Sequence, residues 1–109
     1  MALDLKRPEG QEAVRRLAQK ADVLVENFKT GDLRRFGLDY ESLKPLNPRL
    51  IYLSITGFGH TGPYHQFKTW GPIVQAVCGL TFSSGRPGEP PAGWGYSYLD
   101  WIGAYSFAL

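Results

Sequence analysis

Asp100 is the carboxylate in this sequence whose position best suits covalent chemistry. It is the only acid after Glu89, and it stands where an apolar run predicts a helix that begins near Leu99. The backbone N–H groups and the dipole of a helix N-terminus favour an anionic carboxylate, and such an anion can attack an acyl group as a nucleophile. The alternative is an acid that only caps the helix, and position alone favours it because acids are enriched in first turns.

A second group of residues could bind a molecule that carries a phosphate and an aromatic base. Asn27 and Phe28 follow a predicted strand, and Arg34 and Arg35 come about two helical turns later. An adenine ring can stack on Phe28, and an arginine can pair with a phosphate through two hydrogen bonds. The spacing alone favours the alternative, in which Phe28 belongs to the core and the arginines are solvated.

A glycine-rich loop, Gly-Phe-Gly-His-Thr-Gly-Pro at residues 57–63, follows the most apolar predicted strand. It is not a Walker loop, because no Lys-Ser or Lys-Thr pair follows, and it lacks the spacing of a dinucleotide-binding fingerprint. Ligands of open α/β sheets bind at the carboxyl ends of the strands, where this loop lies. A plain turn that lets the backbone approach another segment is at least as well supported.

Periodicity and turn residues predict the elements that must position these groups. Apolar or alternating runs predict three strands, over residues 1–5, 22–26 and 50–55. Helical patterns predict helices over residues 8–20, 40–46 and 72–80 and from Leu99 onward. Gly37 should end a further short helix. A strand, a helix and a strand of these lengths predict a right-handed parallel crossover, so we expect an α/β fold with parallel strands and flanking helices.

Composition and charge exclude several classes of function. A net charge of +2 on 109 residues is too weak and too dispersed for nucleic-acid binding, and no apolar run approaches bilayer length. The single cysteine, Cys78, forms no intramolecular disulfide, and the Cys and His spacing of a metal site is absent. We therefore expect one domain at most, in a reducing cytoplasm, with no metal, membrane or nucleic-acid partner. The last helical pattern stops without a C-terminal cap, which indicates a piece of a longer protein.

Two segments together resemble a known family. Residues 22–38 contain Asp-Val-Leu-Val-Glu-Asn-Phe, and residues 46–63 contain Leu-Asn-Pro-Arg-Leu-Ile-Tyr-Leu-Ser-Ile-Thr-Gly-Phe-Gly followed by Thr-Gly-Pro. These motifs, in this order, resemble the class III CoA-transferases, the formyl-CoA transferase and carnitine CoA-transferase (CaiB/BaiF) family. The resemblance covers essentially the whole chain.

The resemblance implies an architecture larger than this chain. Members of that family have a Rossmann-like large domain joined to a small domain, and two chains interlock as a homodimer. Residues 1–109 would then be a fragment of the large domain, without the N-terminal strands, the small domain and the C-terminal segment. We expect such a fragment to be inactive in isolation.

The resemblance also implies roles for individual residues. Asp100 matches the aspartate that the thioester acylates, and Lys68 precedes it by 32 residues, the spacing expected in that family. Six positions match contacts to coenzyme A, namely Asn27, Phe28, Arg35, Phe36, Lys68 and Trp70. Among these, Asn27 and Phe28 match contacts to the nucleotide, Arg35 matches a contact to phosphate, and Trp70 replaces a tyrosine near the pantetheine. Gly71 stands where formyl-CoA transferase-like members have a glutamate, so oxalate-type specificity is not implied.

The activity implied is transfer of CoA from an acyl-CoA to a carboxylic acid, through an aspartyl-acyl anhydride and an aspartyl-CoA thioester. Backbone N–H groups near Gly57 and Gly59 would stabilise the oxyanions. Coenzyme A is then a substrate, and no cofactor is bound permanently. One alternative is an acyl-CoA racemase of the same family, but Trp70 occupies the position of the racemase histidine and cannot accept a proton. The other alternative is a CoA-binding module without catalysis.

Overall fold

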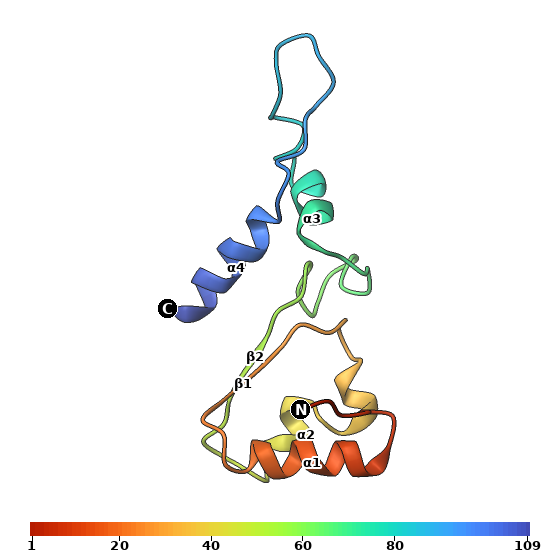
Figure 1. The fold of residues 1–109 in the computed structure, drawn as a ribbon, viewed down its shortest axis with the longest axis vertical. Coiled ribbons are helices and arrows are strands. Elements are labelled where there is room, and N and C mark those ends of the chain that lie inside the picture. The colour runs from red at the N-terminus through yellow and green to blue at the C-terminus, as the bar shows by residue number, and fades with distance from the viewer. The chain divides into compact units, whose positions relative to one another are not determined.

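Two units make up this computed structural model, which describes residues 1–109: Met1–Ile55 and Thr56–Leu109. The first unit contains, in chain order, α1 (Pro8–Ala18), β1 (Val23–Glu26), the 3-10 helix η1 (Leu33–Phe36), α2 (Tyr40–Leu43) and β2 (Ile51–Ser54). The second unit contains α3 (Gly71–Val77) and α4 (Tyr98–Ala108) (Figure 1). The mixture of helices with parallel strands confirms the predicted α/β class.

β1 and β2 form a two-stranded parallel sheet, in which Val23 pairs with Ile51 and Glu26 pairs with Ser54 (Figure 1). Successive side chains of a strand point to opposite faces. Leu24 and Tyr52 therefore share one face, and both pack against the core of this unit. Ile51 lies on the other face and is 55% exposed. The apolar β2 is therefore not buried on both faces within this chain, as strands of all-parallel sheets commonly are.

The predicted strand over residues 1–5 is wrong. The Arg7 N–H donates to the Asp4 carbonyl at 3.1 Å, and the Lys6 N–H donates to the Asp4 carboxylate at 3.0 Å. These bonds turn the chain into α1, where Pro8 occupies the start of the helix as predicted. Two alternating leucines are too short a signal to define a strand, and the parallel pair is built from β1 and β2 instead.

Asn47 closes the C-terminal end of α1. Its side-chain Nδ2 donates to the carbonyls of Ala18 and Ala21, at 2.9 Å in each case. The last carbonyls of a helix lack partners within the helix, so this amide satisfies two groups that the turn after α1 would otherwise leave open. The helix ends at Ala18, two residues before the predicted end.

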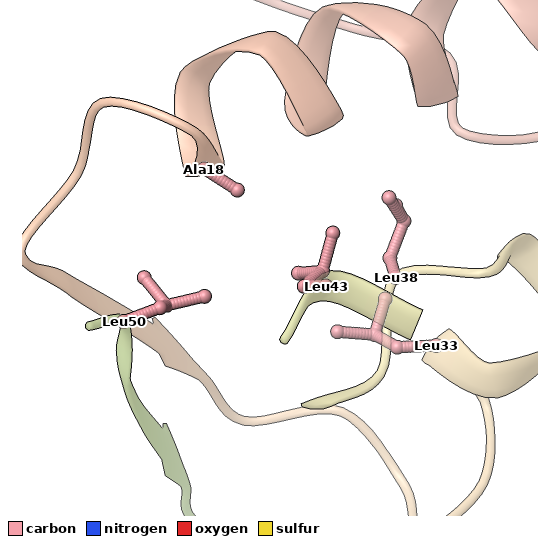
Figure 2. Close-up of a cluster of buried hydrophobic side chains, with 5 residues drawn as sticks. All are labelled: Ala18, Leu33, Leu38, Leu43 and Leu50. Atoms are coloured by element: carbon pink, nitrogen blue, oxygen red, sulfur yellow. The ribbon is translucent and has the colours of Figure 1, made fainter. Parts of the chain in front are cut away.

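Five apolar residues form the core of the first unit: Ala18, Leu33, Leu38, Leu43 and Leu50 (Figure 2). Gly37 adopts φ 62°, a left-handed conformation that glycine reaches without steric cost. It ends η1 as predicted, and the Leu38 N–H then donates to the Leu33 carbonyl at 3.1 Å. The turn brings both leucines into one cluster with Leu43, which is fully buried.

Tyr52 links the sheet to this core through its phenol hydroxyl, which is a titratable group. Its hydroxyl donates to the Leu38 carbonyl at 3.1 Å, and its ring packs edge-on against Tyr40. Burial, together with the negative charges of Glu26 and Asp39, raises the pKa of Tyr52 from 10.0 to about 12, and burial is the largest of these causes. The folded state therefore favours the neutral phenol.

This shift predicts a loss of stability at alkaline pH. Below the unfolded pKa of 10.0 the folded and unfolded states both hold the phenolic proton, and Tyr52 makes its full contribution to stability. That contribution is lost as pH rises toward the folded pKa of about 12. We expect the free energy of unfolding to fall more steeply over this window in the wild type than in Tyr52→Phe. Denaturant unfolding at several pH values measures both slopes, and parallel profiles would contradict the assignment.

The second unit places its two helices in contact with each other. α3 ends at Val77, three residues before the predicted end, and Gly79 continues with φ 84°. Apart from Asp100 and Ser106, α4 carries apolar and aromatic residues, and none of its residues is buried within the chain. None of the helices is both long enough and apolar enough to cross a bilayer.

Candidate active site

Asp100 lies in the first turn of α4, as predicted, and is exposed. Ser97 precedes the helix, and Ser-Tyr-Leu-Asp has the spacing of a capping box. No side-chain hydrogen bond caps α4, however, and the bond that joins these two residues runs from the Asp100 N–H to the Ser97 carbonyl, at 3.0 Å. The geometry of a cap is therefore not formed, and the carboxylate stays open to a reaction partner.

The start of α3 packs directly against this carboxylate. A Cβ atom built on Gly71 would lie 2.5 Å from Asp100 Oδ2 and 2.6 Å from Ser97 Cβ. Real Cβ contacts of that length do not occur, so the bare Cα of Gly71 touches the acid. Sequence reasoning noted Gly71 as a departure from a family pattern but missed this contact.

The segment before α3 also contacts the glycine-rich loop. A Cβ atom on Gly57 would collide with the side chain of Thr69. Thr69 and Gly71 flank Trp70, so one short segment touches the loop start and Asp100. The residues on either side of the predicted residue Trp70 thus contact Gly57 and Asp100 respectively. The side chain of Trp70 is 65% exposed, and Lys68, next to Thr69, is also exposed.

Three aromatic rings pack against one another in the loop that runs between Gly57 and Thr69, although Tyr64 and Phe67 are exposed. The ring centroids of Phe58, Tyr64 and Phe67 lie 5.7, 6.3 and 5.2 Å apart in pairs. A loop whose ends meet and whose own side chains pack against one another is an Ω-loop. Gly59 sits within it at φ 74°. The close-approach turn proposed as an alternative for this loop is therefore formed at Gly57.

Asn27 and Phe28 leave the sheet at the carboxyl end of β1. The Phe28 N–H donates to Glu26 Oε2 at 2.7 Å, and the Ser54 hydroxyl donates to the other oxygen of Glu26. Glu26 therefore fixes the first residues after the strand to the end of β2. Phe28 is 45% exposed, so its assignment to the core is wrong, and its ring is available for stacking.

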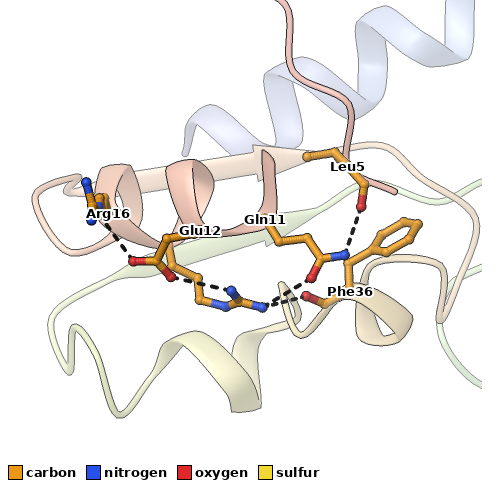
Figure 3. Close-up of polar contacts among 6 residues, drawn as sticks. Leu5, Gln11, Glu12, Arg16 and Phe36 are labelled. Atoms are coloured by element: carbon orange, nitrogen blue, oxygen red, sulfur yellow. Dashed lines mark hydrogen bonds and ion pairs between the residues drawn. The ribbon is translucent and has the colours of Figure 1, made fainter. Parts of the chain in front are cut away.

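Arg35 and Phe36 lie at the end of η1, and Phe36 is held by a hydrogen bond from α1. The Phe36 carbonyl accepts a hydrogen bond from Arg15 Nη2 at 3.1 Å, and Arg15 also forms an ion pair with Glu12 at 3.5 Å (Figure 3). The Arg35 guanidinium lies 5.8 Å from the centroid of the Phe36 ring and 2.8 Å from Asp32 Oδ1. Exposed ion pairs contribute little, so a phosphate could compete with Asp32 for this arginine.

The predicted site residues thus fall into two groups. Asn27, Phe28, Arg35 and Phe36 belong to the first unit, and Gly57, Gly59, Lys68, Trp70 and Asp100 belong to the second. Glu26 and Gly71 were not predicted as site residues. Glu26 and Ser54 are polar residues at the ends of the two predicted strands, and this pattern could have indicated that Glu26 belongs to the site. No local pattern in the sequence marks Gly71. No three potential metal ligands gather at one place in the chain.

The sequence model of CoA-transferase family III matches residues 1–109. The succinate–glutarate CoA-transferase of Agrobacterium fabrum is 52% identical to the chain over 104 residues, which are 94% of this chain and 26% of that protein. The succinyl-CoA–D-citramalate CoA-transferase of Chloroflexus aurantiacus is 41% identical over 109 residues, which are 100% of this chain and 27% of that protein. The chain spans about a quarter of the length of these relatives.

A solved structure gives the same result. A CaiB/BaiF family protein from Brucella suis is 48% identical to the chain and superposes with a TM-score of 0.90. The match covers 97% of this chain and 28% of that chain. Together these comparisons confirm the resemblance found from the sequence motifs.

Proposed function

This chain belongs to CoA-transferase family III, and we propose that the protein moves CoA from an acyl-CoA thioester to a carboxylic acid with Asp100 as the nucleophile. One observation carries the proposal: Asp100 presents an exposed carboxylate in the first turn of α4, outside any capping interaction. The relatives described above carry names of CoA-transferases, which supports the same class of reaction.

The 109 residues would form part of a Rossmann-like large domain in a longer protein. The chain covers only about a quarter of the length of each of these relatives, which supports this arrangement. The complete protein would work as an interlocked homodimer in the cytoplasm, with further segments completing the sheet and the acyl pocket. We expect the isolated 109 residues to be inactive, so the experiments below use the complete enzyme.

The chemistry conserves atoms and electrons without any redox partner. An Asp100 oxygen attacks the thioester carbonyl and the C–S bond breaks. CoA thiolate is the leaving group, and the product on the enzyme is an aspartyl-acyl anhydride. The thiolate attacks the aspartyl carbonyl and expels the donor carboxylate, which leaves an aspartyl-CoA thioester. The acceptor carboxylate opens this thioester to a second anhydride. CoA thiolate then attacks the acceptor carbonyl, and Asp100 leaves as the free carboxylate.

Backbone and side-chain groups of the chain would support these steps. N–H groups near Gly57 and Gly59, and those in the first turn of α4, would stabilise the oxyanions that form at each attack. Asn27 and Phe28 would contact the nucleotide of CoA, and Arg35 would contact a phosphate. The CoA-contacting residues proposed are Asn27, Phe28, Arg35, Phe36, Lys68 and Trp70.

The names of the relatives suggest which substrates to test first. Succinate, glutarate, succinyl-CoA and D-citramalate appear in those names, so we propose small dicarboxylic acids as the acceptor class. The purified enzyme is incubated with succinyl-CoA and each acid, and new acyl-CoA esters are separated by chromatography. A new ester that requires both substrates supports transfer. Binding of CoA without turnover of any acyl pair would contradict it, as would α-carbon deuterium exchange without acyl exchange, the outcome expected of a racemase.

Glu26 gives a prediction for CoA binding. Its carboxylate holds the Phe28 N–H at 2.7 Å, so Glu26→Ala should loosen the segment proposed to contact the nucleotide. Loss of this exposed hydrogen bond costs about 1 kcal/mol, which corresponds to a rise of about fivefold in KM for the acyl-CoA. We expect kcat to change little, because no reacting atom is displaced.

Glu41→Ala is the matched control for this experiment, because Glu41 is an exposed acid of α2 in the same unit. Steady-state kinetics with varied acyl-CoA at saturating acceptor measure both variants. An unchanged KM in Glu26→Ala, or an equal rise in both variants, would show that Glu26 does not position a CoA-binding segment.

A further inference from the structure

Gly71 is buried at the start of α3, whereas its neighbours Trp70 and Pro72 are exposed. An added Cβ would lie 2.5 Å from Asp100 Oδ2, 3.0 Å from Asp100 Cγ and 2.6 Å from Ser97 Cβ. Contacts shorter than 3.0 Å force one partner to move. With the backbone of this chain, a side chain at position 71 would therefore displace either the carboxylate or the residue that precedes α4.

Close approach explains this glycine, and backbone conformation does not. Gly71 is absent from the set of glycines with positive φ, which includes Gly59 and Gly79. Its backbone angles are therefore open to any residue. What excludes a side chain is the lack of space between α3 and the start of α4.

Gln75 shows that the same face of α3 fixes this part of the chain. Residues four apart lie on one face of a helix, so Gln75 stands above Gly71. Gln75 is 3% exposed, and its Nε2 donates to the Tyr96 carbonyl at 3.1 Å. Tyr96 immediately precedes Ser97, so the chain entering α4 is held by a hydrogen bond at one point and by the Gly71 contact at the other.

We infer that Gly71 is a positioning residue for Asp100: its bare Cα lets the carboxylate lie against α3, and this contact sets where the nucleophile stands. The inference rests on the proposed role of Asp100. No capping hydrogen bond orients the carboxylate, and the close approach of Gly71 restrains it on the side that faces α3. Gly71→Ala should move the carboxylate away from the start of α3.

Displacement of a reacting group by about 1 Å lowers rates by about 100-fold. We expect Gly71→Ala in the complete enzyme to lower kcat by about that factor, with KM for the acyl-CoA within about twofold of the wild type, since no proposed CoA contact is removed. Gly103→Ala in α4 is the control. A Cβ at Gly103 meets no atom within 4 Å, so this variant should keep its kcat.

A second variant distinguishes the effect of the contact with the Asp100 carboxylate from the effect of the contact with Ser97. The contact with Ser97 Cβ could itself unfold Gly71→Ala, and Ser97→Gly removes that atom. Gly71→Ala/Ser97→Gly should recover most of the melting temperature but keep the low kcat, because the conflict with Asp100 remains. Ser97→Gly alone provides the baseline. A kcat in the double variant equal to that of Ser97→Gly would overturn the inference.

Melting temperatures test the contact independently of catalysis. Gly71→Ala should lower the melting temperature less in an Asp100→Ala background than in the wild type, because the conflicting oxygen is gone. An equal decrease in both backgrounds would overturn the inference, whatever the activities are. If Asp100→Ala retained turnover while this coupling was present, the proposed function would fail and the contact would stand, so the two failures are distinguishable.

Discussion

Asp100→Ala should abolish acyl transfer in the complete enzyme while the fold survives. Removal of a nucleophile lowers kcat by at least about four orders of magnitude, because alanine can form no covalent intermediate. The side chain is exposed and caps nothing, so we expect the free energy of unfolding to change by less than about 0.5 kcal/mol. Transfer from an acyl-CoA to a dicarboxylic acid measures the first effect, and denaturant unfolding measures the second.

Glu89→Ala is the control for loss of a negative charge, since Glu89 is an exposed acid of the same unit. It should retain transfer. Asp100→Asn is less suitable, because deamidation can restore the aspartate. Turnover near the wild-type rate in Asp100→Ala would remove Asp100 from the mechanism, and global unfolding of this variant would contradict its assignment as an exposed site residue.

Leu43→Ala should cause the largest loss of stability. Leu43 is 0% exposed and lies in the core of the first unit with Leu33, Leu38 and Leu50. Truncation of a buried leucine removes its transfer free energy and leaves a cavity, which together cost about 2 to 5 kcal/mol. Urea unfolding should show a lower midpoint with an unchanged slope, since the same surface is exposed on unfolding.

Leu46→Ala provides the comparison, because Leu46 is 40% exposed and lies shortly after α2. It should cost no more than about 1 kcal/mol, since less apolar area leaves water on folding. Equal losses in the two variants would show that the cluster around Leu43 is not the main core of this unit.

Most elements of the fold could be predicted from local signals. Pro8 marks the start of α1, Gly37 ends η1, and apolar runs mark β1 and β2, each within one or two residues. The error over residues 1–5 arose because two leucines in alternation fit a strand and a turn equally well. The exposed face of the sheet also escaped prediction, because sequence does not tell how many strands or helices cover it.

The candidate site was predictable only in part. The place of Asp100 in the first turn of an apolar helix was predictable, but local signals alone favoured a cap for Asp100 and a core position for Phe28. Only the family resemblance implied the roles proposed for them. The contacts that hold these residues join positions far apart in sequence: Gly71 with Asp100, and Glu26 with Ser54. Such contacts depend on the packing of whole elements, which no local pattern encodes.

Mass spectrometry of the complete enzyme tests the central claim most directly. The enzyme is incubated with the acyl-CoA donor in the absence of an acceptor, and the reaction is then quenched in acid. After digestion, the mass of the peptide that contains Asp100 is measured. We predict a mass gain equal to an acyl group or to CoA in a thioester, and its loss when the acceptor acid is added. If that peptide never gains mass while transfer product accumulates, Asp100 is not the covalent carrier.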